Sequence, residues 1–106
     1  FVLKTQKNAW LHLLATSIVV ILSFYLQLDR MEWLAILLVI GLVWMAEFLN
    51  TAFEVIVDLA SPEIHPLAKI GKDVGAASVL IAAILSIIVG VIVLGPVILY
   101  KYNLFQ

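Results

Sequence analysis

The sequence contains no cysteine and little charge. Without cysteine among the 106 residues, disulfide frameworks and thiolate metal sites are excluded, and the redox compartment is left undecided. Only 12% of the residues are charged, about half the share of a typical soluble domain, and 65% are hydrophobic. Six Lys and Arg nearly balance seven Asp and Glu, so no basic surface exists to attract nucleic acid. This composition excludes disorder and an ordinary soluble protein, and it predicts a single membrane-embedded domain over residues 1–106.

Three long apolar stretches predict three transmembrane helices. A bilayer core about 30 Å thick requires roughly 20 apolar residues in a helix. Residues 9–28, 33–49 and 74–94 are apolar stretches of about this length, and the last of them has no ionisable side chain. We therefore expect an all-α, integral membrane fold with three transmembrane helices per subunit.

The connections between these stretches differ in length. Residues 29–32 form a polar turn that would make the first two helices antiparallel neighbours. Residues 58–73 form a longer polar connection, in which Ser61-Pro62 or His65-Pro66 could open a short turn or the third helix. The Gly95-Pro96 pair is expected to end or kink the third helix.

The basic residues predict the orientation in the membrane. The N-terminal flank and the long connection share one side and hold more of them than the opposite side (Lys4, Lys7, Lys69 and Lys72 against Arg30 and Lys101). Because cytoplasmic loops carry the excess of Lys and Arg, the long connection is expected in the cytoplasm.

A polar stripe crosses the end of the second apolar stretch. Its five members are separated by helical spacings, and at about 100° per residue all of them fall within a wedge of about 100°. They are Glu47, Asn50, Thr51, Glu54 and Asp58. A purely structural membrane helix needs no carboxylates near its end, so the stripe indicates a functional site.

Glu47 and Glu54 suit different chemistry. Glu47 lies about one turn inside the membrane interface, where a charge is costly and usually marks a site or relay. A carboxylate there can serve as a general base. Glu54 is closer to water and could ligate Mg²⁺, which prefers carboxylate oxygen and water. The alternative for Glu54 and Asp58 is that they are simply solvated where the helix leaves the membrane.

The start of the third helix carries a matching set of groups. Lys69, Lys72 and Asp73 share one helical face at the membrane border. A lysine facing the carboxylate stripe suits a Mg²⁺–phosphate ligand. The alternative is an inter-helix salt bridge from Lys72 to Asp58 or Glu54.

Several other residues are interpreted as structural. Gly71 and Gly75 form a GxxxG pattern, which indicates close helix packing. His12 and His65 have no metal-ligand spacing and are assigned packing or interfacial roles. Trp44 lies deep in the second stretch, where we expect it to pack.

Two segments resemble the signatures of the prokaryotic diacylglycerol kinase family. Residues 46–58 (AEFLNTAFEVIVD) are similar to its first signature and residues 69–77 (KIGKDVGAA) to its second. Residues 61–68 resemble the branch from Gram-positive bacteria, whose preferred substrate is often undecaprenol. The resemblance covers nearly the whole chain and implies a small homotrimeric enzyme of the bacterial inner membrane.

The resemblance also implies a role for each motif residue. Glu47 would activate the lipid hydroxyl as the catalytic base, and Asn50 would orient the substrate or the metal–phosphate group. Glu54 would ligate Mg²⁺ and Lys72 would bind phosphate. The remaining pair, Asp58 and Asp73, would hold the nucleotide or support the lysine.

The N-terminal residues depart from the family pattern. Gln6 stands where the family usually has a glutamate that is a second metal ligand, so it would offer the metal and nucleotide a carbonyl oxygen without a charge. The family also carries an amphipathic surface helix upstream. The chain begins at Phe1, and we expect that helix to be absent from it.

These observations lead to one main hypothesis and two alternatives. The main hypothesis is ATP- and Mg²⁺-dependent phosphorylation of a membrane lipid hydroxyl, on undecaprenol or diacylglycerol, with the active site on the cytoplasmic side. The first alternative is a non-enzymatic oligomeric channel or proton path lined by Glu47. It does not explain why polar residues gather at one border of the membrane. The second is a kinase-like subunit in which Gln6 impairs catalysis.

Overall fold

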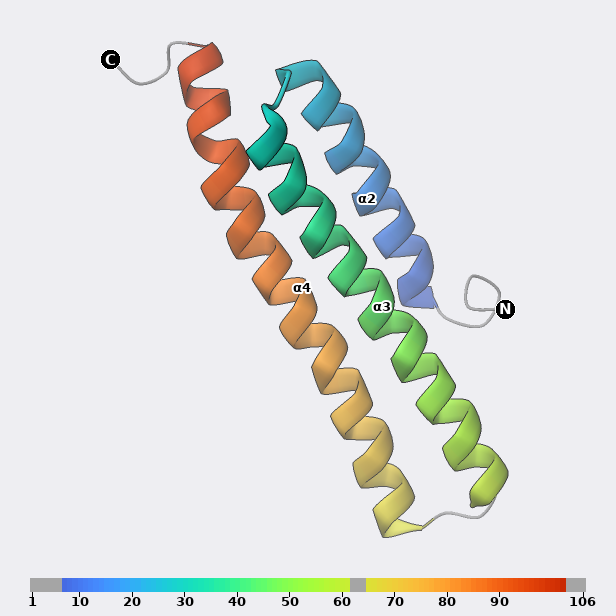
Figure 1. Cartoon of the computed structure of the whole chain (residues 1–106). Helices are drawn as coiled ribbons and strands as arrows, with labels where there is room; N and C mark the ends of the chain where they lie inside the picture. The colour runs from blue at the N-terminus through green and yellow to red at the C-terminus, as the bar shows by residue number, and fades with distance from the viewer. Residues whose placement is uncertain (1–6, 62–64, 103–106) are drawn as a thin grey trace.

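A computed structural model describes residues 7–61 and 65–102, which form three helices (Figure 1). They are α2 (Lys7–Leu26), α3 (Arg30–Ala60) and α4 (Pro66–Lys101). Consecutive helices run antiparallel and form a bundle of 60 × 22 × 20 Å. All three are long and apolar enough to cross a membrane. The expected all-α architecture, with three helices able to span a membrane, is confirmed.

The turn between α2 and α3 is fixed by a capping box. The Asp29 side chain accepts a hydrogen bond from the Glu32 backbone N–H at 2.8 Å, and the Asp29 N–H donates to Glu32 Oε1 at 2.9 Å. Gln27 closes α2 in the left-handed region, at φ 56°. The expected turn at 29–32 is therefore displaced towards the N-terminus, because Arg30 and the residues after it already belong to α3.

The connection between α3 and α4 is much shorter than residues 58–73. α3 continues to Ala60, and α4 begins at Pro66. Of the two proline pairs considered, His65-Pro66 opens the helix: the His65 Nδ1 atom accepts from the Leu67 N–H at 3.0 Å, and Pro66 occupies the first turn. The expected boundaries of the connection were wrong because α3 and α4 extend beyond their apolar stretches. The polar residues in these extensions resemble those of a loop in the sequence.

The third helix does not end at Gly95-Pro96. α4 passes through Pro96 and continues to Lys101. A proline removes one backbone hydrogen bond, but membrane helices tolerate it because neighbouring groups and local adjustments satisfy the freed carbonyl. At this end, the Lys101 ammonium donates to the Tyr25 carbonyl at 3.1 Å and the Tyr102 hydroxyl to the Tyr25 hydroxyl at 2.9 Å. These contacts join the ends of α2 and α4.

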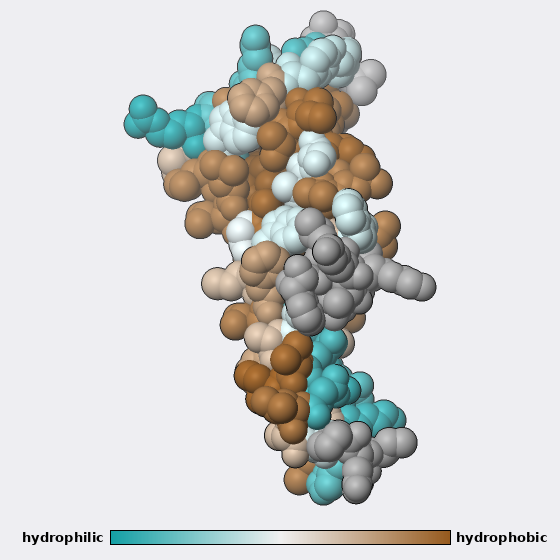
Figure 2. All heavy atoms as spheres, turned by 90° about the vertical axis from the view of Figure 1, so that its right-hand side faces the viewer, coloured by the Kyte–Doolittle hydropathy of each residue, from teal (hydrophilic) through white to brown (hydrophobic). Residues whose placement is uncertain are grey.

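The surface has the pattern of a membrane protein. Large apolar side chains are exposed along all three helices, including Ile21, Leu38 and Ile81. Hydrophilic residues gather at the two ends, and the surface between them is mostly brown or pale (Figure 2). Hydroxyl groups within the helices donate to a carbonyl one turn earlier, as Ser23 and Ser86 do. Their hydrogen bonds are therefore satisfied without water.

Candidate active site

The site forms where the start of α2 reaches the middle of α3. Beyond this level α3 and α4 continue without α2 beside them (Figure 1). The polar stripe of α3 becomes more exposed along this direction. Glu47, Asn50 and Thr51 are buried, Glu54 is half-buried, and Asp58 is exposed. The stripe therefore leads from the interior of the bundle to the outer end of α3.

A cavity of about 340 Å³ lies between the three helices at this level. Its polar wall comes from α3 and consists of Glu47, Asn50 and Glu54. α2 contributes Leu11 and His12. The wall from α4 is entirely apolar and is made of Ala76, Val79, Leu80 and Ala83. The cavity thus combines carboxylate and amide groups with a lining that suits an aliphatic chain.

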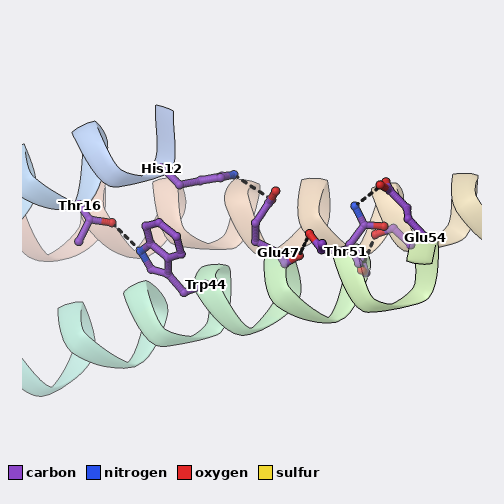
Figure 3. A network of polar contacts seen from close by, with 9 residues as sticks. His12, Thr16, Trp44, Glu47, Thr51 and Glu54 are labelled. Carbon is purple, nitrogen blue, oxygen red and sulfur yellow. Dashed lines mark hydrogen bonds and ion pairs between the residues drawn. The ribbon is translucent and has the colours of Figure 1, made fainter. Parts of the chain in front are cut away.

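Among the residues whose burial the structure describes, Glu47 is the most buried charged one, with 2% of its surface exposed. Its Oε2 atom lies 3.4 Å from the Nε2 atom of His12, which comes from α2 (Figure 3). The Thr51 hydroxyl donates to the Glu47 backbone carbonyl at 3.0 Å. A buried carboxylate is costly unless a partner supports it, and here the histidine provides that partner.

Asn50 has one satisfied and one unsatisfied end. Its Nδ2 group donates to Glu54 Oε1 at 3.4 Å, while its Oδ1 atom is buried and has no hydrogen-bond partner. A buried acceptor without a partner is unusual and costs about 1–3 kcal/mol. The Oδ1 atom faces Gly75 of α4, where an added Cβ would lie only 2.4 Å away. The Asn50 side chain is therefore enclosed between Glu54 on its amide nitrogen side and Gly75 on its oxygen side.

The residues at the membrane border form an ion pair. The Lys72 ammonium lies 2.5 Å from Asp58 Oδ1, so α4 and α3 are joined here. Of the two interpretations of Lys72, the inter-helix salt bridge is therefore present. Both side chains are substantially exposed, at 41% and 64%, and such a solvent-screened pair contributes little to stability. A lysine held this weakly can exchange its partner for a phosphate.

The sequence-predicted residues thus fall into two groups. Glu47, Asn50 and Glu54 line the cavity, whereas Asp58, Lys72 and Asp73 lie outside its lining, and Asp73 is exposed. Gln6 lies outside the described residues. Among the residues that the structure describes, no three His, Asp or Glu side chains approach closely enough to hold a metal ion. The half-buried Glu54 carboxylate is the ligand type that Mg²⁺ prefers, and the ion would complete its shell with phosphate and water oxygens.

His12 was not predicted as part of the site. The assignment to packing was incomplete, because the ring packs edge-on against Trp44 at 6.3 Å and also contacts Glu47. Trp44 packs as expected and in addition donates from Nε1 to the Thr16 hydroxyl at 2.9 Å. His12 and Thr16 are one turn apart on α2, and this spacing was the only signal in the sequence that both face one neighbour.

Comparison with known proteins identifies relatives over most of the chain. Residues 1–94 match the family described as prokaryotic diacylglycerol kinase. The chain is 40% identical to the undecaprenol kinase of Bacillus subtilis over 93 residues, which cover 88% of this chain and 76% of that protein. It is 38% identical to the diacylglycerol kinase of Synechocystis over 91% of this chain and 55% of that protein. For the diacylglycerol kinase of Escherichia coli the identity is 35%, over 76% of this chain and 66% of that protein.

The relatives bear on the alternatives drawn from the sequence. All three are named as kinases, and the matched part spans little more than half of the Synechocystis protein. The alternative of a channel or proton path finds no support in these comparisons.

Proposed function

Since the chain belongs to the prokaryotic diacylglycerol kinase family, we propose that it is a lipid kinase that transfers the γ-phosphoryl group of ATP to the hydroxyl of a membrane lipid. Residues 1–106 act as one membrane-embedded catalytic domain. The observation that carries the proposal is the buried Glu47 carboxylate in a cavity with an apolar wall, on the same helix face as the polar groups at the membrane border.

The proposal divides the chemistry along α3. The lipid hydroxyl reaches Glu47 from within the bilayer, while the nucleotide approaches Glu54 from the aqueous end. As the hydroxyl oxygen attacks the γ-phosphorus, Glu47 accepts the hydroxyl proton, and the bond from phosphorus to the ADP oxygen breaks. Phosphoryl transfer depends mainly on positioning and on charge neutralisation, so a few residues on two helices suffice.

The remaining site residues hold the nucleotide and its metal ion. Glu54 would offer a carboxylate oxygen to Mg²⁺, which when bound neutralises charge on the phosphates, and Asn50 would orient the substrate or the metal–phosphate group. Gln6 adds a carbonyl oxygen to this set. Lys72 exchanges Asp58 for phosphate oxygens, and Asp73 supports the nucleotide at the exposed end of the site.

The acceptor, assembly and orientation belong to the same proposal. The acceptor is a lipid alcohol, either undecaprenol or diacylglycerol, since relatives named for each are similar to this chain. The chain assembles as a homotrimer in the bacterial inner membrane. The border formed by Asp58 and Lys72 faces the cytoplasm, as the distribution of basic residues favours.

The function is tested with purified protein in lipid nanodiscs. We expect labelled phosphate to pass from ATP to undecaprenol or diacylglycerol, and the transfer to stop when EDTA removes Mg²⁺. A lipid of matched chain length without a hydroxyl group serves as the control. If no lipid alcohol in the panel is labelled, the proposed function is wrong.

The ion pair at the border gives a prediction about Lys72. Lys72→Met should weaken ATP binding about 10-fold or more, because the phosphate loses a cationic partner. Asp58→Asn should leave the free energy of unfolding nearly unchanged, because an exposed pair contributes little. Isothermal titration with ATP and thermal unfolding measure the two effects. Equal loss of ATP binding in both variants would show that the pair itself, rather than the lysine, is required.

The position of Gln6 gives a second prediction. Gln6→Glu should strengthen Mg²⁺-dependent ATP binding by about 3- to 10-fold, because a carboxylate is a better ligand for Mg²⁺ than an amide oxygen. The measurement is a Mg²⁺ titration of ATP binding. Gln6→Asn, which keeps the amide and shortens the side chain, is the control. An unchanged Mg²⁺ dependence would mean that residue 6 does not contact the metal.

A further inference from the structure

Two polar contacts join α2 to α3 beside the cavity. His12 Nε2 lies 3.4 Å from Glu47 Oε2, and one turn further along α2 the Thr16 hydroxyl accepts from Trp44 Nε1 at 2.9 Å (Figure 3). We propose that His12 is a positioning residue, whose Nε2–H group orients the Glu47 carboxylate towards the lipid hydroxyl. This inference rests on the proposed lipid kinase function, and it concerns a residue outside both family signatures.

The surroundings of Glu47 explain why such a residue is required. On the α4 side the cavity wall is apolar, so it offers no donor to the carboxylate. The Thr51 hydroxyl is engaged with the Glu47 backbone carbonyl. A glutamate has three rotatable side-chain bonds, and without a donor the carboxylate can occupy several rotamers. The His12 ring supplies a donor from the opposite helix and reduces this freedom.

The His12 ring is itself held in place. It packs edge-on against Trp44, with ring centroids 6.3 Å apart and planes at 63°. Trp44 is fixed in turn by its hydrogen bond to Thr16. The side chain of His12 is 19% exposed and that of Glu47 is 3% exposed, so water has little access to the contact. A supporting residue of this kind, held by packing, is what keeps a catalytic group in a productive geometry.

The chemistry of the contact defines the form of the histidine. A neutral imidazole carries its proton on one nitrogen, and a proton on Nε2 allows donation to Glu47. The separation of 3.4 Å is longer than a charge-assisted hydrogen bond of about 2.8 Å. Contacts to catalytic groups are often long without substrate and shorten when it binds. We therefore expect this contact to tighten when the lipid hydroxyl occupies the cavity.

Three variants separate positioning from packing. His12→Leu removes the donor, and we expect kcat to fall about 10- to 100-fold while KM for ATP changes less than about twofold. His12→Gln places an amide N–H near the position of Nε2, and it should retain kcat within about threefold. Ser17→Ala removes an α2 hydroxyl whose hydrogen bond to the Leu13 carbonyl stays within that helix, so kcat should stay within about twofold.

The outcomes of this comparison are distinct. If His12 only packs, His12→Leu keeps its activity, or Ser17→Ala loses as much as His12→Leu, and the proposal is overturned. Should His12→Leu fail to fold in a thermal unfolding experiment, the activity of His12→Gln decides, because loss of kcat in a folded Gln variant also overturns it. A wild-type protein that phosphorylates no lipid alcohol refutes the proposed function instead.

A spectroscopic measurement tests the contact without catalysis. The chain has two histidines, so ¹⁵N-labelled imidazole signals in nanodiscs can be assigned with a single His12 variant. Glu47→Gln should shift the His12 Nε2 resonance, whereas Glu54→Gln, in the same cavity wall, should leave it in place. The His65 signal is the internal reference. An unchanged His12 resonance in Glu47→Gln would refute the contact.

Discussion

Replacing Glu47 with glutamine is expected to abolish lipid phosphorylation, with kcat falling about 10²- to 10⁴-fold. Glutamine has nearly the same shape and keeps a carbonyl oxygen towards His12, but it cannot accept the proton of the lipid hydroxyl. Nucleotide binding should remain within about threefold, because Glu47 is buried at 2% exposure and Glu54 lies seven positions further towards the aqueous end. Transfer of labelled phosphate and isothermal titration with ATP measure the two quantities.

The matched control is the same change at Glu54. Glu54→Gln should weaken Mg²⁺-dependent ATP binding about 10-fold or more, because a metal ligand loses its charge. We therefore expect Glu47→Gln to lose turnover but keep ATP binding, and Glu54→Gln to lose Mg²⁺-dependent ATP binding. Equal loss of turnover and nucleotide binding in Glu47→Gln would refute its role as the base.

Replacing Gly75 with alanine is expected to lower both stability and turnover. The added Cβ would lie 2.4 Å from Asn50 Oδ1 and 3.4 Å from Asn50 Cγ, so the buried asparagine must move. Such overpacking typically costs about 1–3 kcal/mol of stability. The displaced amide would also lose its place beside Glu54, so we expect kcat to fall about 10-fold or more.

The same helix provides the control for this prediction. Gly71 is one turn earlier in the GxxxG pattern, and an added Cβ there would lie 3.9 Å from Val57 Cγ2, an ordinary contact. Gly71→Ala should therefore retain activity and should not destabilise the helix, since alanine is the better helix former by about 1 kcal/mol. Thermal unfolding and turnover are measured for both variants. Indistinguishable results would show that Gly75 does not set the position of Asn50.

Periodicity within one helix could be predicted well from the sequence. The spacing of Glu47, Asn50 and Glu54 placed them on one face of α3, and the structure brings all three to one cavity wall. The three membrane helices followed from apolar length alone. These features depend on local geometry, which every helix repeats.

Contacts between helices could not be predicted in the same way. His12 meets Glu47 and Gly75 meets Asn50 only because of the relative rotation and register of separate helices. No pattern within a single helix contains that information. The GxxxG spacing did indicate that Gly75 packs closely, but it could not name the partner. Helix ends were misjudged for other reasons. α4 continues through Pro96, and polar residues extend α3 and α4 beyond their apolar stretches.

The continuity of α3 has a consequence for how turnover depends on the thickness of the bilayer. Glu47 and Glu54 lie on one uninterrupted helix, so their separation along the helix axis is fixed at about 10.5 Å. A thicker or thinner bilayer cannot change that interval. It can only change the depth of Glu47 relative to the depth at which a lipid presents its hydroxyl. Turnover should therefore be highest at one acyl-chain length of the bilayer lipids. That optimum would report the depth of the Glu47 carboxylate in the membrane.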